Sequence, residues 1–361
     1  MLSHLRSIAR YGLTRDEFLL RARERLMTQS APVDEVWTQD HWRTIEIQTS
    51  ALALKAAREE DAWAVIVRRA RSVLRNYSTS FYLVTRFLPK QKREKVEAIY
   101  AAVRYPDEVV DTFSLTKGER GAWLDEWTAQ YERGLACNSI HEALQQEVPC
   151  FLASFTKVVR DAGIPHEHYR AFLQAMRLDS EPRPFATLDD LIDNYIYGSA
   201  IVVGYFLTHV YGSVSGKEFV RALDCARNLG IALQLTNFLR DAGEDFKRGR
   251  IYLPQDMLRA EGITEPDFDN PKQHRAISAV LRQLVEVAEG YYARSLVDLD
   301  AFNPDSRIAI HSCIKVYRRL NDRISTNQFR PRHRESVPVS EKFRILPASK
   351  YWRIPLAYLR K

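Results

Sequence analysis

Residues 229–245 read LGIALQLTNFLRDAGED, and this stretch decides the fold class of the chain. In a helix, four of its polar side chains would lie along one stripe, at steps of three, four and four: Gln234, Asn237, Asp241 and Asp245. Apolar side chains cover much of the remaining circumference, which is typical of a buried helix. Buried amides and carboxylates without partners cost several kcal/mol each, so the stripe needs cations, a ligand or a hydrogen-bond network. A solvated acidic helix end is the alternative, because charged residues follow directly.

A second pair of aspartates four apart occurs earlier, as Asp107 and Asp111 in the sequence DEVVD. Residues four apart share a helix face, where two carboxylates repel each other unless a cation lies between them. Magnesium-type cations bind through one or two carboxylates plus substrate phosphates. Two such pairs facing one cavity would therefore bind divalent cations and a diphosphate. Arg104 extends the first stripe, although Pro106 lies within it and must kink the helix or begin a new one.

Helical patterning runs through nearly the whole chain, and strand signals are sparse. Thr187 with Asp190 resembles a capping box, and the apolar segment that follows runs to Tyr211, with Gly212 as its expected stop. Four further long helices are expected, joined by loops that contain Pro or Gly: Gln91–Arg104, Leu144–Ala162, Lys217–Asp241 and Gln273–Leu299. The pattern predicts an all-α domain with an interior polar site.

Composition excludes several other classes of protein. A content of 45% hydrophobic and 27% charged residues in 361 is ordinary for a globular domain, and no apolar run approaches the roughly 20 residues of a membrane span. The sequence His166-Glu167-His168 is interpreted as a polar loop, because no further His or Cys lies near it. Four scattered cysteines favour reduced core thiols in a cytosolic protein: Cys137, Cys150, Cys225 and Cys313.

The motifs together resemble the squalene/phytoene synthase family, the head-to-head isoprenyl diphosphate synthases. The resemblance covers roughly Arg71 to Asn327. Its elements are STSFY at 78–82, the first aspartate pair with Arg104, the helix Tyr195–Gly204, residues 229–245, RGRIYLPQD at 248–256, and Tyr317. The sequence of residues 248–256 most resembles that of bacterial and plant phytoene synthases. Where many members have a glycine between Tyr195 and Gly204, this chain has Ile201, a bulkier and stiffer residue that we expect to reshape the prenyl pocket.

The resemblance implies a single-domain terpenoid-synthase helical bundle around a central cavity, and it implies roles for individual residues. Catalytic roles fall to Asp107, Asp111, Asp241, Asp245, Tyr195 and Tyr317. Substrate binding falls to Ser80, Phe81, Tyr82, Arg104, Gln234, Asn237, Arg240, Arg250 and Tyr252. Magnesium or manganese would be held by Asp107, Asp111, Asn237, Asp241 and Asp245.

The reaction that the resemblance implies joins two allylic isoprenyl diphosphates through a cyclopropylcarbinyl diphosphate. The resemblance favours two geranylgeranyl diphosphates, which would give phytoene without a reductant, in carotenoid biosynthesis; farnesyl diphosphate is the alternative substrate. Two farnesyl diphosphates would give dehydrosqualene, or squalene if NADPH supplies hydride. Two further interpretations stay open: a magnesium-dependent terpene cyclase or head-to-tail prenyltransferase, and a non-catalytic binding or assembly protein on the same fold.

Three segments are expected along the chain: a helical extension of unknown role at 1–65, the catalytic domain at 66–327 and a basic tail at 328–361. From residue 327 onward there are nine Lys or Arg and two acids. Their net charge of +7 equals the formal net charge of the whole chain. Aromatic residues interleave these bases, so the tail would rest on an anionic membrane surface or fold back on the domain. Nucleic-acid binding is the weaker interpretation. We expect a cytoplasmic protein, peripheral to the membrane if the tail binds lipid, and the sequence does not determine its oligomeric state.

Overall fold

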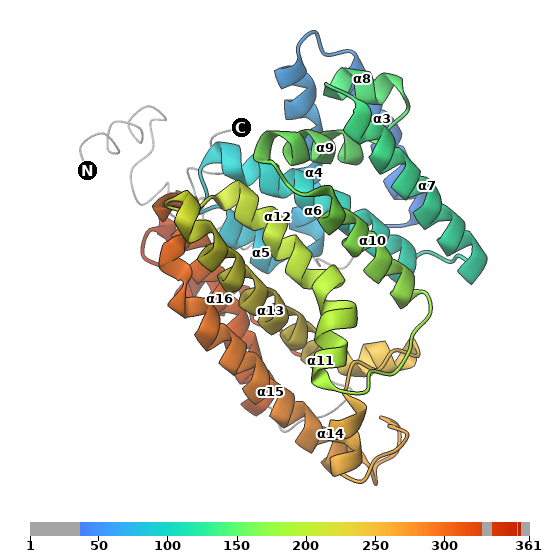
Figure 1. The fold of residues 1–361 in the computed structure, drawn as a ribbon, viewed down its shortest axis with the longest axis vertical. Helices are drawn as coiled ribbons and strands as arrows, with labels where there is room; N and C mark the ends of the chain where they lie inside the picture. The colour runs from blue at the N-terminus through green and yellow to red at the C-terminus, as the bar shows by residue number, and fades with distance from the viewer. Residues whose placement is uncertain (1–36, 327–333, 352, 355–361) are drawn as a thin grey trace.

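The computed structural model describes residues 37–326, 334–351 and 353–354, and this part of the chain is helical throughout, without a strand (Figure 1). The prediction of an all-α fold is therefore confirmed. The helices of the first half are α3 (Gln39–Leu54), α4 (Glu59–Tyr77), α5 (Thr79–Thr85), α6 (Lys90–Asp111), α7 (Lys117–Ala136), α8 (Ile140–Gln145), α9 (Cys150–Ala162) and α10 (His166–Asp179). Those of the second half are α11 (Leu188–Leu191), η1 (Ile192–Ile201), α12 (Val202–Tyr211), η2 (Gly216–Glu218), α13 (Phe219–Lys247), α14 (Gln255–Ala260), α15 (His274–Val297), η3 (Leu299–Ala301), α16 (Pro304–Thr326) and α17 (Val339–Ile345).

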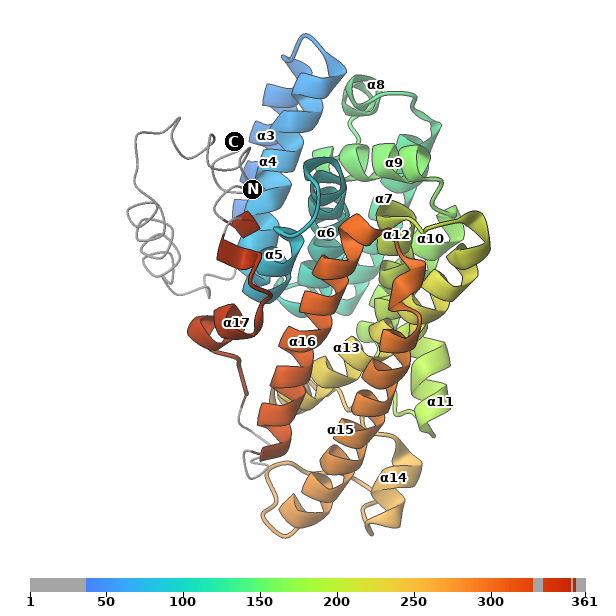
Figure 2. The same cartoon turned by 90° about the vertical axis from the view of Figure 1, so that its left-hand side faces the viewer.

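Helix α13 contains the decisive stretch 229–245 and is the longest helix described, at 29 residues. It packs beside α15 and α16, and the three lie together in both views (Figures 1 and 2). Helix α6, which contains the first aspartate pair, packs on α4 and α9. The two pairs thus come from different sides of one bundle.

Helix α6 continues through Pro106 as a single helix, so no new helix begins there. Proline has no N–H to donate to the carbonyl of Ala102, four residues earlier. The hydroxyl of Tyr169 on α10 donates to that carbonyl instead, at 2.8 Å. A side chain from a neighbouring helix thus supplies the missing donor, which lets Arg104, Asp107 and Asp111 stay on one helix.

The segment after Thr187 begins and ends as predicted but changes helix type on the way. The Thr187 side chain accepts from the N–H of Asp190, and α12 ends at Tyr211 before Gly212, whose φ is 68°. Between them, η1 is a π-helix, a form that often marks functional sites. Gly198 lies within it, and a Cβ there would lie 2.6 Å from the carbonyl oxygen of Ala171. The close approach of η1 to α10 therefore requires glycine.

Two other expectations about helices were wrong. The predicted helix Leu144–Ala162 is interrupted between α8 and α9, because Pro149 precedes α9 and Glu147 has a positive φ of 60°. His166-Glu167-His168 is not a loop but the first turn of α10, following Pro165. Proline directly before the first helical residue is a common start signal that outweighs the polar composition.

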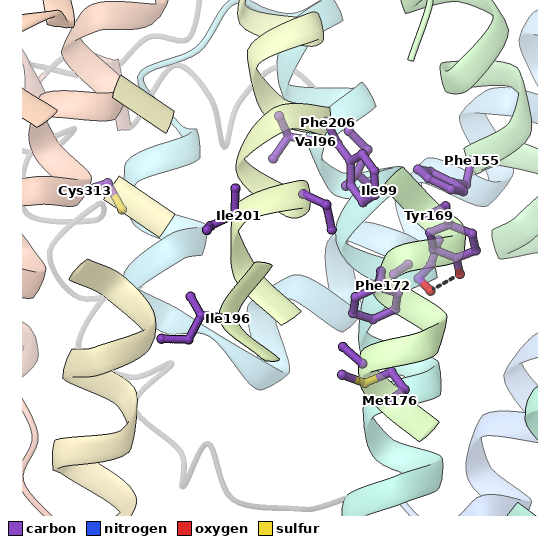
Figure 3. Packing of buried hydrophobic residues seen from close by; sticks show 14 of the residues in the cluster. Val96, Ile99, Phe155, Tyr169, Phe172, Met176, Ile196, Ile201, Phe206 and Cys313 are labelled. Carbon is purple, nitrogen blue, oxygen red and sulfur yellow. Dashed lines mark hydrogen bonds between the residues drawn. The ribbon is translucent and has the colours of Figure 1, made fainter. Parts of the chain in front are cut away.

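The core is dominated by aromatic and branched side chains between α6, α9, α10 and α12. The rings of Phe155 and Tyr169 lie 4.6 Å apart and those of Phe155 and Phe206 lie 5.6 Å apart (Figure 3). All four cysteines are free and buried, as expected for reduced core thiols. Within the described residues, no helix is both long and apolar enough to cross a membrane.

The described part of the basic tail folds back on the domain. Lys342 donates to the Thr79 hydroxyl at 3.1 Å, and Arg353 donates to the carbonyl of Phe87 at 2.6 Å. Arg319 and Arg323 of α16 pair with Glu341 of α17. This agrees with the second of the two expected arrangements, while the tail aromatics Trp352 and Tyr358 lie outside the described residues, as do residues 1–36 of the extension.

Candidate active site

Two cavities of similar size meet inside the bundle. The apolar lobe has a volume of about 370 Å³ and is lined by α5, α6, η1, α12, α13 and α16; the polar lobe, of about 340 Å³, is lined by α4, α6, α13 and the segment after α13. One set of side chains borders both lobes: Tyr77, Arg104, Asp107, Tyr195, Gln234, Asn237 and Arg240. The lobes therefore form one continuous site.

The polar lobe brings the predicted carboxylates and cations together. All four predicted aspartates line it, with Arg104, Gln234, Asn237, Arg240, Arg250, Tyr195 and Tyr252. The stripe predicted on α13 is therefore confirmed in its placement. The lobe is also lined by charged residues that the motifs did not indicate: Glu108, Asp179, Glu244, Arg248 and Arg334.

The first aspartate pair is neutralised by arginines of the chain itself. Arg104 contacts Asp107 at 2.5 Å, and the buried Arg250 forms an ion pair with Asp111. Burial, together with repulsion from Asp111 that Arg104 only partly offsets, raises the pKa of Asp107 to about 7. In this arrangement Asp107 holds its proton well above the ordinary range of a carboxyl group.

The second pair is asymmetric. Asp241 contacts both Arg240 and Arg334 at 2.9 Å, and these cations hold its pKa below the ordinary value although burial acts the other way. Burial and the neighbouring Asp241 and Asp111 raise the pKa of Asp245 to about 7. An added cation would therefore stabilise the charged form of Asp245 more than that of Asp241.

The arrangement fits a hard divalent cation on the chemistry of its donors. Within residues 37–326, 334–351 and 353–354, no three His, Cys, Asp or Glu side chains are gathered closely enough to hold a metal, and three of the four aspartates are paired with arginines. The side-chain oxygen of Asn237, however, is buried without a hydrogen-bond partner where the lobes meet. Amide and carboxylate oxygens are the ligands that magnesium prefers.

Asp179 is a buried carboxylate of the polar lobe that the sequence did not indicate. Its carboxylate accepts hydrogen bonds from Tyr195 at 2.7 Å and from Tyr252 at 2.8 Å, and burial raises its pKa to about 6. The ring of Tyr252 stacks on Phe238 of α13 with 4.2 Å between centroids. Asp179 therefore fixes the two tyrosines at the wall of the polar lobe, and no spacing in the sequence links it to either of them.

The remaining predicted residues lie partly in the apolar lobe and partly outside both lobes. Phe81 and Tyr317 line the apolar lobe, with Ser78 beside them. Neither Ser80 nor Tyr82 lines either lobe; Tyr82 is buried under the guanidinium of Arg86, 4.2 Å from its ring.

Ile201, which stands where many proteins with this motif have a glycine, does not line the apolar lobe. Ile201 is fully buried and is not among the lining residues, whereas Ala200 and Val203 are. A Cβ at Gly230 of α13 would lie 3.1 Å from the Cα of Ile201. The isoleucine thus contributes to helix packing behind the lobe.

Comparison with protein families agrees with this geometry. The model of the family described as squalene/phytoene synthase matches residues 74–342. The chain belongs to the squalene/phytoene synthase family. Membership makes it a prenyltransferase of the class that joins isoprenyl diphosphates head to head.

Individual relatives support the same assignment. The chain is 30% identical to a phytoene synthase of Arthrospira platensis over 77% of this chain and 90% of that protein. It is 31% identical to a 15-cis-phytoene synthase of Enterobacter agglomerans over 75% of this chain and 90% of that protein.

Solved structures share the fold. A dehydrosqualene synthase in complex with a ligand superposes with a TM-score of 0.66 at 23% identity, covering 84% of this chain and 99% of that chain. The squalene synthase HpnC from Alicyclobacillus acidocaldarius superposes with a TM-score of 0.60 at 21% identity. The match covers 77% of this chain and 99% of that chain. The predicted terpenoid-synthase bundle is therefore confirmed.

Proposed function

We propose that the protein condenses two molecules of geranylgeranyl diphosphate into phytoene, through a cyclopropylcarbinyl (prephytoene) diphosphate, in carotenoid biosynthesis. The observation that carries this proposal is the pair of adjoining cavities, in which an apolar lobe shares a wall with a lobe that contains both aspartate pairs. This shape suits a substrate with a long hydrocarbon tail and an anionic head. The names of the curated relatives support the choice of substrate and product.

Magnesium or manganese would be held by the two aspartate pairs and by the side-chain oxygen of Asn237. When bound, such a cation supplies Lewis-acid neutralisation of the diphosphate leaving group. Asp107, Asp111 and Asp241 are ready for this role only after their arginine partners move to another anion, which the diphosphate would supply. Cation and substrate would therefore bind together.

The arginines of the polar lobe would then contact phosphate oxygens. Arg104, Arg240 and Arg250 each pair with an aspartate of the site, so they already face the place where the diphosphate would lie. A guanidinium group offers parallel N–H donors that match phosphate geometry. Gln234 borders both lobes and would orient waters or ligands at the junction.

The apolar lobe would protect and steer the carbocation. The faces of aromatic rings attract cations, and Phe81, Tyr195 and Tyr317 all border this lobe. Its other walls are mostly apolar side chains, which exclude water that would quench the cation. The double bond of the second substrate attacks the allylic cation of the first, and the cyclopropyl intermediate ionises again, rearranges and loses a proton.

Product analysis tests the proposal directly. The purified protein is incubated with magnesium and either geranylgeranyl or farnesyl diphosphate, with and without NADPH, and hydrocarbons are identified by mass spectrometry. A C40 hydrocarbon formed without NADPH is expected. A C30 product would instead make the protein a dehydrosqualene or squalene synthase, the latter requiring NADPH.

The same assay separates the other classes of function. A cyclic hydrocarbon made from one substrate molecule would identify a terpene cyclase. Absence of product from either diphosphate, in a folded protein, would favour the non-catalytic alternative. The retention of both aspartate pairs argues against that alternative, because a binding protein has no use for repelling carboxylates at the wall of a cavity.

A further inference from the structure

Helix α3 lies outside the family match, which begins at residue 74, yet it contacts the active site through Tyr77. The indole N–H of Trp42, a side chain 1% exposed, donates to the Tyr77 hydroxyl oxygen at 3.1 Å. The backbone N–H of Trp37 donates to the same oxygen at 3.2 Å. The two rings of Trp42 and Tyr77 stack with 5.8 Å between centroids.

These two donors determine where the Tyr77 proton points. A phenolic oxygen has two lone pairs and one proton. Both lone pairs here accept from the α3 segment, which is residues 37–54: helix α3 and the two residues before it. The proton is therefore left for Glu108, whose carboxylate accepts from Tyr77 at 3.2 Å. Glu108 is fully buried, so its charge needs these partners.

Glu108 in turn holds Arg104, which lines both lobes of the cavity. One amino group of Arg104 pairs with Glu108 and the other contacts Asp107 at 2.5 Å. The guanidinium also lies over the ring of Tyr77, 4.4 Å from its centroid. Arg104 is thus fixed by three contacts, two of which depend on the position of Tyr77.

We propose that the α3 segment is a positioning element of the diphosphate site: Trp37 and Trp42 orient Tyr77, which with Glu108 holds Arg104 toward the diphosphate. A free arginine side chain loses rotamer entropy when it is immobilised. Order imposed before the ligand arrives removes part of that cost from binding. The inference rests on the proposed function only in assigning a diphosphate to the polar lobe.

Helix α3 has a second anchor that does not involve the site. The carboxylate of Glu46 accepts from the backbone N–H of Cys150 at the start of α9, and Ile45 is buried on the same helix. Loss of the Trp42 donor therefore does not release α3. A variant at Ile45 loosens the packing of α3 without removing a hydrogen bond to Tyr77, which provides a matched control.

The test uses the full chain and inorganic pyrophosphate as the probe. Pyrophosphate is titrated by calorimetry in the presence of magnesium into the wild type, Trp42→Phe, Tyr77→Phe, the double variant and the control Ile45→Val. We expect Trp42→Phe to weaken binding about tenfold, or about 1.4 kcal/mol, because Tyr77 loses a donor that directs its proton toward Glu108. Tyr77→Phe keeps the ring and should have a similar effect.

Non-additivity distinguishes positioning from loss of packing. If Trp42 acts through the Tyr77 hydroxyl, the double variant binds no more weakly than Tyr77→Phe alone. Ile45→Val should lower the Tm and leave pyrophosphate affinity within about twofold of the wild type. In steady-state assays Trp42→Phe should raise KM more than it lowers kcat, because Arg104 contacts the diphosphate before and during ionisation.

Each outcome decides the inference. Wild-type affinity in Trp42→Phe, losses that add in the double variant, or an equal loss in Ile45→Val would overturn it, and so would a wild type that does not bind pyrophosphate. Should Trp42→Phe fail to fold, Tyr77→Phe against Ile45→Val decides the question alone. Failure of the proposed function looks different: the wild type would bind pyrophosphate, with the expected losses in the variants, yet form no doubled hydrocarbon.

Discussion

The two lobes of the cavity are similar in volume but opposite in physical character. The polar lobe is crowded with charges that neutralise one another, such as Asp111 with Arg250 and Asp241 with Arg334. The apolar lobe is lined beyond the shared residues mostly by apolar side chains, including Leu229, Leu233 and Ala309. Binding in the polar lobe exchanges one set of ion pairs for another, whereas binding in the apolar lobe depends on buried area. Changes in the two lobes should therefore break different steps.

The largest effect is expected from the aspartates of the polar lobe. Asp111→Ala or Asp241→Ala removes a proposed cation ligand and the carboxylate partner of neighbouring arginines, so turnover should fall about a thousandfold or more while the fold persists. Turnover with saturating magnesium and circular dichroism measure the two properties. Asp161→Ala, at an exposed aspartate paired with Lys157, is the control. Near-normal turnover in both site variants would overturn the assignment of the metal site.

A smaller, selective effect is expected in the apolar lobe. Ala309 lies two turns of α16 before Tyr317, about 12 Å deeper along the helix. Ala309→Phe should shorten the lobe and lower kcat/KM for a C20 diphosphate at least about tenfold more than for a C15 diphosphate. Ala309→Ser keeps the residue small and should leave the ratio unchanged. An equal loss for both substrates would show that the lobe does not hold the prenyl chain.

The pH dependence of cation binding separates the lobes further. Asp107 and Asp245 have pKa values of about 7 in the folded protein, above their ordinary value of 3.8. The metal-free fold therefore favours their protonated forms and loses stability as pH rises from about 4 through 7. Magnesium binds the ionised forms, so the rise in Tm that it causes should be larger at about pH 8 than at about pH 6. Equal shifts at both pH values would contradict this, and Asp245→Asn should reduce the difference.

The smallest effect on products is expected behind the apolar lobe. Ile201→Val removes one methylene from a fully buried side chain that does not line the lobe. It should cost about 0.5–1.5 kcal/mol of folding free energy. The pattern of hydrocarbon products should stay as in the wild type. A shift in product length by mass spectrometry would show that Ile201 shapes the prenyl pocket after all.

The polar lobe could largely be predicted from sequence, because its chemistry is carried by residue identity and helical spacing. Asp241, Asp245 and Asn237 share one helix, and a period of 3.6 residues is sufficient to align them. The apolar lobe could not be predicted in the same way. Cys225 and Ala309 line a cavity, yet in sequence they are indistinguishable from residues of a packed core.

Residues that reach the site from distant segments were also beyond the reach of spacing arguments. Asp179 ends α10 and Arg334 follows α16, and neither belongs to a local motif with its partner. At the short helix α5 the sequence indicated the right segment but not which of its side chains face the cavity. Ser78 and Phe81 face the cavity there, whereas the intervening Ser80 does not line it, and a seven-residue helix has too little pattern to tell its faces apart.

The most direct test of the central claim uses an equimolar mixture of unlabelled and fully deuterated geranylgeranyl diphosphate with magnesium. If two molecules are joined head to head, mass spectrometry of the C40 hydrocarbon should show unlabelled, half-labelled and fully labelled product, with the half-labelled form most abundant. A hydrocarbon that contains only unlabelled or fully labelled molecules of C20 size would show that one substrate molecule is processed at a time, and would contradict the account.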